Sequence, residues 1–155
     1  MNAKRRVWLG AAALSAAAGL LAGCGGMMHG DKGGMMHGDR MGGHVTLSGA
    51  NEVPPVTTDA SGMGMVQVGA DGAVSVHLRV SGMTATAAHI HEAAAGANGP
   101  VIVPLTKQGD DTFVSPAGAR FTESQLAAYK AGRTYVNVHS AKNPPGEIRA
   151  QLSGN

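Results

Sequence analysis

One segment near the middle of this 155-residue chain alternates strictly between apolar and polar side chains. The apolar members of the pattern are Val74, Val76, Leu78 and Val80, and the polar members are Ser75, His77 and Arg79. Successive side chains of a β-strand point to opposite faces of its sheet. The pattern therefore predicts a strand with one face buried and the other in water.

Further short segments of this kind follow one another from residue 44 to the end of the chain. We expect strands at 44–50, 63–68, 74–80, 87–91, 101–105, 134–139 and 147–152. Only 122–131 resembles a helix, with Thr122 as its N-cap and Gly132 as its stop. Aromatic residues make up 3% of the chain, so the core must be aliphatic. The sequence predicts an all-β fold, an antiparallel β-sandwich or flattened barrel with one short helix, over residues 44–155.

The first 24 residues have the three parts of a secretory signal. Lys4, Arg5 and Arg6 precede an uncharged apolar stretch, 7–21, which is shorter than the ~20 residues of a membrane-spanning helix. Leu21-Ala22-Gly23-Cys24 then resembles the lipobox at which bacterial lipoproteins are cleaved. We expect a signal peptide at 1–23 and acyl chains such as palmitate on Cys24.

Acylation of Cys24 would make a lipid bilayer the first partner of this chain. Acyl chains contribute ~0.8 kcal/mol per buried methylene, which amounts to permanent attachment. The residue after Cys24 is Gly25 rather than Asp. In a cell with two membranes, that residue indicates the outer membrane, facing the periplasm. We therefore expect a location in the bacterial cell envelope.

A flexible tether is expected at 24–43, where an eight-residue repeat rich in Met, His and Gly occurs twice. Thioether sulfur suits Cu(I), and imidazole suits both oxidation states of copper. The candidate copper ligands of this segment and its end are Met27, Met28, His29, Met35, Met36, His37, Met41 and His44. The alternative is a plain linker in which these residues are incidental.

Three histidines of the domain are expected on outward faces of two strands. His89 and His91 are two residues apart and point to the same side. His139 alternates with Val136 and Val138, which should face the core. If the two strands are neighbours, the three imidazoles converge and could bind copper or zinc. The alternative is a hydrogen-bonded cluster that holds the loop at 98–100.

A fourth metal ligand could come from one of three side chains, His77, Glu92 or Glu147. Glu147 and Arg149 share a face of the last strand and could instead form a surface ion pair. Glu52, beside two prolines, is expected to fix a turn.

Four segments of the domain resemble the CHRD domain, a family named from chordin. They are Leu47-Ser48-Gly49-Ala50-Asn51-Glu52-Val53-Pro54-Pro55, Ala88-His89-Ile90-His91, Gly96-Ala97-Asn98-Gly99-Pro100-Val101, and Tyr135-Val136-Asn137-Val138-His139 with Asn143-Pro144-Pro145-Gly146-Glu147-Ile148-Arg149. Glu92 and Ala150 stand where the family usually has Gly. The resemblance implies an all-β domain and little about activity. A shorter stretch, 89–92, is similar to the His-x-His-Glu of copper-zinc superoxide dismutase.

Charge and motifs narrow the function without deciding whether the chain is an enzyme. Without its leader the chain has nine basic and ten acidic residues, which argues against a nucleic-acid partner. Three functions remain open. The first is a metal-binding envelope lipoprotein, and the second is a superoxide dismutase-like enzyme whose metal changes oxidation state near Arg149. The third is a non-catalytic module for extracellular interaction or adhesion.

Overall fold

The computed structural model describes residues 40–154. In this part of the chain nine strands, one 3-10 turn and one α-helix follow one another. They are β1 (Arg40–Ser48), η1 (Gly49–Asn51), β2 (Ser61–Gly69), β3 (Val74–Ser81), β4 (Ala85–His91), β5 (Val101–Pro104), β6 (Thr106–Gln108), β7 (Thr112–Val114), α1 (Glu123–Lys130), β8 (Thr134–Ser140) and β9 (Ile148–Leu152). Within the same range, no helix is both long and apolar enough to cross a membrane.

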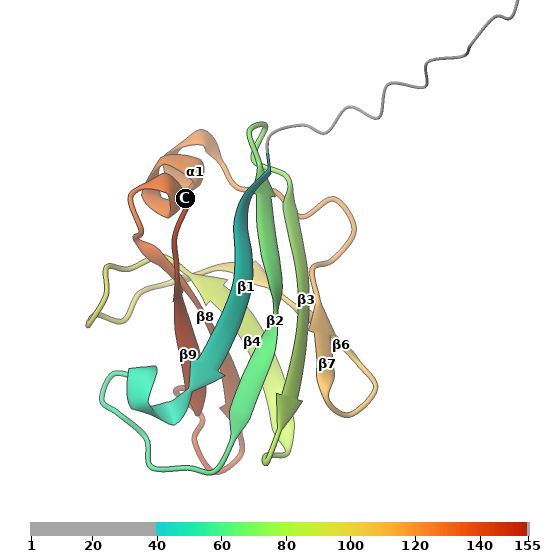
Figure 1. Cartoon of the computed structure of the whole chain (residues 1–155), viewed down its shortest axis with the longest axis vertical. Helices are drawn as coiled ribbons and strands as arrows, with labels where there is room; N and C mark the ends of the chain where they lie inside the picture. Colours follow the sequence, from blue (N-terminus) through green and yellow to red (C-terminus); the bar gives the residue numbers. More distant parts are fainter. Residues whose placement is uncertain (1–39, 155) are drawn as a thin grey trace, which may run out of the picture. The chain divides into compact units, whose positions relative to one another are not determined.

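The strands form one sheet in the order β5-β4-β8-β9-β1-β2-β3-β7-β6, and every strand pair in it is antiparallel. Figure 1 shows this sheet rolled into two layers, with β1, β2 and β3 side by side in front of β4, β8 and β9. The two ends of the sheet approach each other where β6 contacts β4. This architecture confirms the predicted all-β fold with one short helix.

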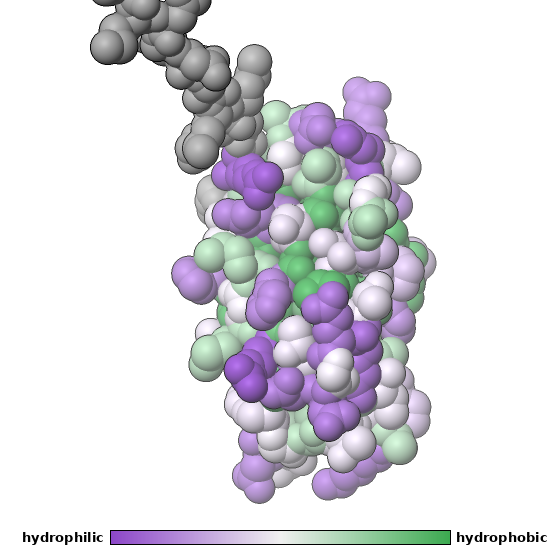
Figure 2. All heavy atoms as spheres, turned by 90° about the vertical axis from the view of Figure 1, so that its right-hand side faces the viewer, coloured by the Kyte–Doolittle hydropathy of each residue, from purple (hydrophilic) through white to green (hydrophobic). Residues whose placement is uncertain are grey.

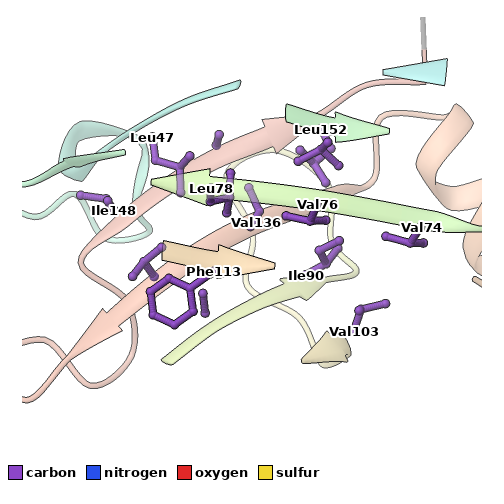
Figure 3. Close-up of a cluster of buried hydrophobic side chains, with 14 of the residues drawn as sticks. Leu47, Val74, Val76, Leu78, Ile90, Val103, Phe113, Val136, Ile148 and Leu152 are labelled. Carbon is purple, nitrogen blue, oxygen red and sulfur yellow. The ribbon is translucent and has the colours of Figure 1, made fainter. Parts of the chain in front are cut away.

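The core lies between the two layers and is mainly aliphatic, as the composition predicted, with Phe113, Phe121 and Tyr129 as its aromatic members. On β3 the four apolar residues are buried and the residues between them are exposed, so the predicted alternation is confirmed. Val136 and Val138 of β8 face the same core and are fully buried. Figure 3 shows side chains of both layers pointing toward one another, with Phe113 among them. Hydrophilic and apolar residues are mixed over the face that carries β3, β6 and β7, and the most apolar ones are visible mainly near its middle (Figure 2).

The helix begins and ends where the sequence indicated. Thr122 is the N-cap, and its hydroxyl accepts a hydrogen bond from the backbone N–H of Gln125. The Gln125 side chain accepts from the Thr122 N–H in return, which completes a capping box. Gly132 follows the helix with a φ of 67°, a left-handed conformation that glycine adopts readily.

Two strands were not anticipated from the sequence, and several others, β1 and β2 above all, extend beyond the expected ranges. β6 and β7 are three residues each and contain a single buried side chain, Phe113, so they lack a recognisable alternation. β1 begins at Arg40, inside the range assigned to the tether, because it pairs with β2 as far as Gly69.

Candidate metal centre

Two neighbouring strands place His89, His91 and His139 together. His89 and His91 lie on β4, and His139 lies on β8, where it is paired with Ala87 of β4. One ligand nitrogen from each ring lies within 4.8 Å of the other two. The two strands are therefore adjacent, which was the condition for convergence, and the three rings do converge.

Two of the three imidazoles are oriented by carbonyl groups of the backbone. The Nδ1 atom of His91 lies 2.9 Å from the carbonyl oxygen of Gly99, and Nδ1 of His139 lies 2.9 Å from that of Pro144. A carbonyl oxygen can only accept, so both Nδ1 atoms carry the hydrogen. The lone pair of each neutral ring is then on Nε2. Metal-binding histidines in proteins usually make this kind of second hydrogen bond.

The third imidazole contacts one of these free nitrogens. Nδ1 of His89 lies 2.9 Å from Nε2 of His139. Because Nε2 of His139 is an acceptor, the hydrogen of this contact belongs to His89. A cation entering the cluster would replace that hydrogen and bind both nitrogens, provided that the proton of His89 moves to its Nε2 atom.

The Nε2 atom of His91 is buried and has no hydrogen-bond partner. His91 is 8% exposed, so water does not readily satisfy this atom. An unsatisfied buried polar atom costs about 1–3 kcal/mol, and few occur in a native fold without a reason. Nitrogens bound to one ion at ~2.0–2.1 Å lie about 3–4 Å apart, so small ring rotations would complete a three-imidazole site. The residues therefore fit a transition-metal ion.

The surroundings keep two of these rings neutral, which metal binding requires. Burial lowers the pKa of His91 below its usual value, although the hydrogen bond to Gly99 acts in the opposite direction. Burial also lowers the pKa of His89, and the positive charges that His139 and His91 would carry lower it further.

The three fourth-ligand candidates lie outside this group of nitrogens. His77 is exposed on β3, which three strands separate from β8 in the sheet. Glu92 follows β4 and is partly exposed. The carboxylate of Glu147 accepts hydrogen bonds from the hydroxyls of Thr58, at 2.7 Å, and Ser140. Among residues 40–154, no Asp, Glu or Cys joins the three histidines.

The expectation of a surface ion pair between Glu147 and Arg149 is wrong. Both side chains are buried, and Arg149 is 1% exposed. Its guanidinium donates to the carbonyl oxygen of Ala97 at 2.9 Å and to the side-chain oxygen of Asn98 at 3.1 Å. The outward face of β8 and β9 is thus not in water, because the loop at 92–100 is bound across it.

Comparison with known families identifies the family of the domain. A family model described as the CHRD domain matches residues 44–152. The chain belongs to the CHRD domain family. The resemblance read from the sequence is thereby confirmed. No curated protein and no solved structure matches the chain.

Glu52 is a buried residue of the CHRD domain whose surroundings the sequence did not reveal. It is 5% exposed, and its Oε1 atom has no hydrogen-bond partner. A Cβ atom on Gly146 would lie 2.6 Å from this oxygen and 2.6 Å from Nδ2 of Asn137. Burial raises the pKa of Glu52, and the charge of Arg149 offsets part of that rise. An acidic residue beside Pro54 and Pro55 is typical of an exposed turn, so the sequence offered no indication that the Glu52 side chain is buried.

Only part of the predicted set of tether ligands lies among the described residues. Met41 lies in β1 and packs against the core, and His44 lies in β1 with its side chain exposed. The expected signal peptide at 1–23 lies outside the described residues. So do the expected lipidation site, Cys24, and the other candidate ligands, Met27, Met28, His29, Met35, Met36 and His37.

Proposed function

We propose that this chain is an envelope lipoprotein whose CHRD domain binds one transition-metal ion, copper or zinc, through His89, His91 and His139. The observation that carries the proposal is the buried, unpartnered Nε2 atom of His91 beside the nitrogens of the other two rings. A merely structural cluster would use its buried hydrogen-bonding atoms, whereas this one leaves a lone pair free.

The ligand set explains why the proposed ion is copper or zinc. All three ligands are neutral imidazoles, which both metals accept at ~2.0–2.1 Å. Three protein ligands leave one position open on a four-coordinate ion. Calcium and magnesium prefer oxygen ligands, and no carboxylate of residues 40–154 joins the group.

The proposed membrane anchor rests on the sequence. The leader at 1–23 ends in small residues before Cys24, and acylation there would hold the domain at the membrane surface of the envelope. The Met- and His-rich segment would then lie between the anchor and the domain. We propose that this segment captures copper close to the domain site.

A superoxide dismutase-like activity receives less support from the site. Such an enzyme needs an accessible cation that attracts the anion toward the metal. Arg149, the cation expected in that role, is 1% exposed and holds the loop at 92–100. The decay rate of superoxide with and without the metal-loaded chain tests this alternative directly.

Metal content after dialysis tests the proposed site. The full-length chain, purified in detergent, is loaded with Zn(II), Cu(II) or Cu(I) beside a variant with His89, His91 and His139 all changed to Ala. We expect one zinc ion per chain in the first and none in the second. His77→Ala, an exposed histidine on another strand, is the matched control and should keep its zinc.

Two other results have distinct meanings. Equal zinc content in the chain and in the triple variant would place zinc binding outside the three-histidine centre and contradict the proposed site. No metal in any form of the chain would contradict the metal proposal as a whole. A non-catalytic interaction module would then be the remaining function.

A further inference from the structure

Three side chains that can bind a soft metal lie in one row across the front layer of the sheet. His44 of β1 is paired directly with Met65 of β2, and Met65 is paired directly with His77 of β3. Figure 1 shows these three strands side by side. The two histidines are 33 positions apart in the sequence, and only the strand register sets an imidazole on each side of the sulfur.

All three side chains point away from the core. Along each strand the residues beside the row, among them Val66 and Leu78, face the hydrophobic interior. Successive side chains alternate, so His44, Met65 and His77 share the outer face. His44 and His77 are exposed, and Met65 between them is partly exposed.

Side chains on this face reach one another across the strands. Arg40 donates a hydrogen bond to Gln67 at 3.2 Å on one side of the row, and Ser61 and Ser81 are 3.0 Å apart on the other. Directly opposite residues in an antiparallel pair have Cβ atoms about 4.5–5.5 Å apart. Each imidazole of the row can therefore approach the Met65 sulfur with an ion between them.

We propose that His44, Met65 and His77 form a second metal site, selective for a soft monovalent cation such as Cu(I) or Ag(I). Thioether sulfur is a soft ligand that zinc does not favour, and the two imidazoles complete a neutral set of three ligands. Arg79 lies two residues beyond His77 on the same exposed face of β3, and its guanidinium is paired with Asp111 at 3.0 Å, which reduces its repulsion of a bound ion.

The row is independent of the three-histidine centre. β1, β2 and β3 are separated from β8 by β9 in the sheet, and the two sites share no residue. A chain with both would hold Cu(I) on an exposed sheet face close in sequence to its Met- and His-rich segment. The row would then be an intermediate binding site for copper on its way from that segment to the three-histidine centre.

Methyl NMR of methionine tests this site in the full-length chain. Ag(I) is the probe because it is diamagnetic and does not change oxidation state under these conditions. The chain carries ¹³C in its methionine methyl groups, and Met65→Leu identifies the Met65 signal. We expect one equivalent of Ag(I) to shift this signal and Zn(II) to leave it in place.

Substitution of the flanking histidines shows whether they are ligands. His44→Gln combined with His77→Gln should weaken the Met65 response at least about tenfold, since loss of even an outer partner does so in metal sites. The matched control is Ser75→Ala, the next outward residue on β3, and it should change nothing. All of these positions are partly or fully exposed, so the variants should keep the fold, which the remaining methionine signals report.

Two outcomes would overturn the proposal. One is a Met65 signal that stays in place while other methionines respond, which would confine silver to the N-terminal segment. The other is a Met65 response that the histidine substitutions do not weaken. The triple variant of His89, His91 and His139 should retain the Met65 response, so failure of either site is distinguishable from failure of the other.

Discussion

The imidazole of His91 lies flat against the ring of Tyr135, with centroids 4.8 Å apart and planes inclined by 7°. The guanidinium of Arg149 lies over the same phenol ring, 3.4 Å from its centroid. Because β8 runs between β4 and β9, the imidazole and the guanidinium approach Tyr135 from opposite sides. A candidate metal ligand is thus held by a three-layer stack beneath the loop at 92–100.

Removal of the Tyr135 ring should weaken both the fold and the metal centre. We expect Tyr135→Leu to lower the free energy of unfolding by about 2–4 kcal/mol, because a buried aromatic ring and its contact with a cation are lost. Tyr135→Phe keeps the stack and loses only the hydroxyl that accepts from the Gly99 N–H at 3.3 Å. Urea unfolding and competition for zinc measure the two effects. Similar zinc affinities in both variants would contradict a positioning role for the stack.

Metal binding should stabilise the folded chain. The three ligands come from strands about 50 residues apart, so the unfolded chain does not hold them together. A ligand that binds only the folded state at 100 times its Kd adds about 2.7 kcal/mol. We expect zinc to raise the thermal midpoint of the chain and not that of the triple histidine variant. An equal rise in both would place the stabilising ion elsewhere.

Acid should release the metal from the centre, but only well below neutral pH. Burial lowers the pKa of both His89 and His91, so their neutral forms persist below the usual value of about 6.5. Protons displace the metal only as the pH falls through these lowered values. Zinc retained after dialysis between pH 8 and pH 4 measures this. Half-release above pH 6.5 would contradict the expected direction.

Glu147 should make stability depend on pH through its two hydroxyl partners. Burial raises the pKa of Glu147, but hydrogen bonds from Ser140 and Thr58 outweigh it, so the net pKa lies below the usual value. Because the pKa of Glu147 is lower in the folded state, its ionised carboxylate stabilises the fold above about pH 4.5. This contribution is lost as the pH falls through the pKa that Glu147 has in the folded chain. At pH 7 Glu147→Gln should cost about 1.5–3 kcal/mol. Its urea-unfolding profile from pH 7 to pH 3 should be flatter, and parallel profiles would show that Glu147 is not the cause.

Gly146 should tolerate no side chain, whereas Gly96, another glycine with positive φ, should tolerate a small one. A Cβ atom on Gly146 would meet Asn137 and Glu52 at 2.6 Å, in backbone with a φ of 148°. Gly96 has a φ of 79°, and nothing lies within 4 Å of its Cβ position. We expect Gly96→Ala to cost about 1–2 kcal/mol from the backbone alone and Gly146→Ala clearly more. Equal losses in chemical unfolding would show that the buried polar contacts contribute nothing.

Much of the fold was predictable because alternation is a local property. The pattern on β3 fixed which side chains face the core, and the same reasoning set Val136 and Val138 inward and His139 outward. The helix was predictable because its start signal, Thr122, and its stop signal, Gly132, each act on neighbouring residues of the chain. The short strands β6 and β7 were not predicted, because an alternating pattern cannot be recognised in three residues.

The candidate metal centre was predictable in its members but not in its surroundings. His89 and His91 share a face at any register, so their pairing needed only a strand. The burial of Arg149 needed the loop at 92–100 to cross the outer face, and this contact joins residues about 50 positions apart. Long-range contacts of this kind leave no periodic signal, which is why a surface ion pair was expected there.

The strand faces, the helix with its ends, and the three histidines as candidate ligands follow from the amino-acid sequence, since each depends on neighbours along the chain. Which of those residues meet follows from the folded chain. Sheet order placed β4 against β8 and so joined the three histidines. Strand register set His44 and His77 on either side of Met65, although the sequence had assigned the two histidines to different sites. Pairing between distant strands is a property of the whole folded chain, and no local pattern encodes it.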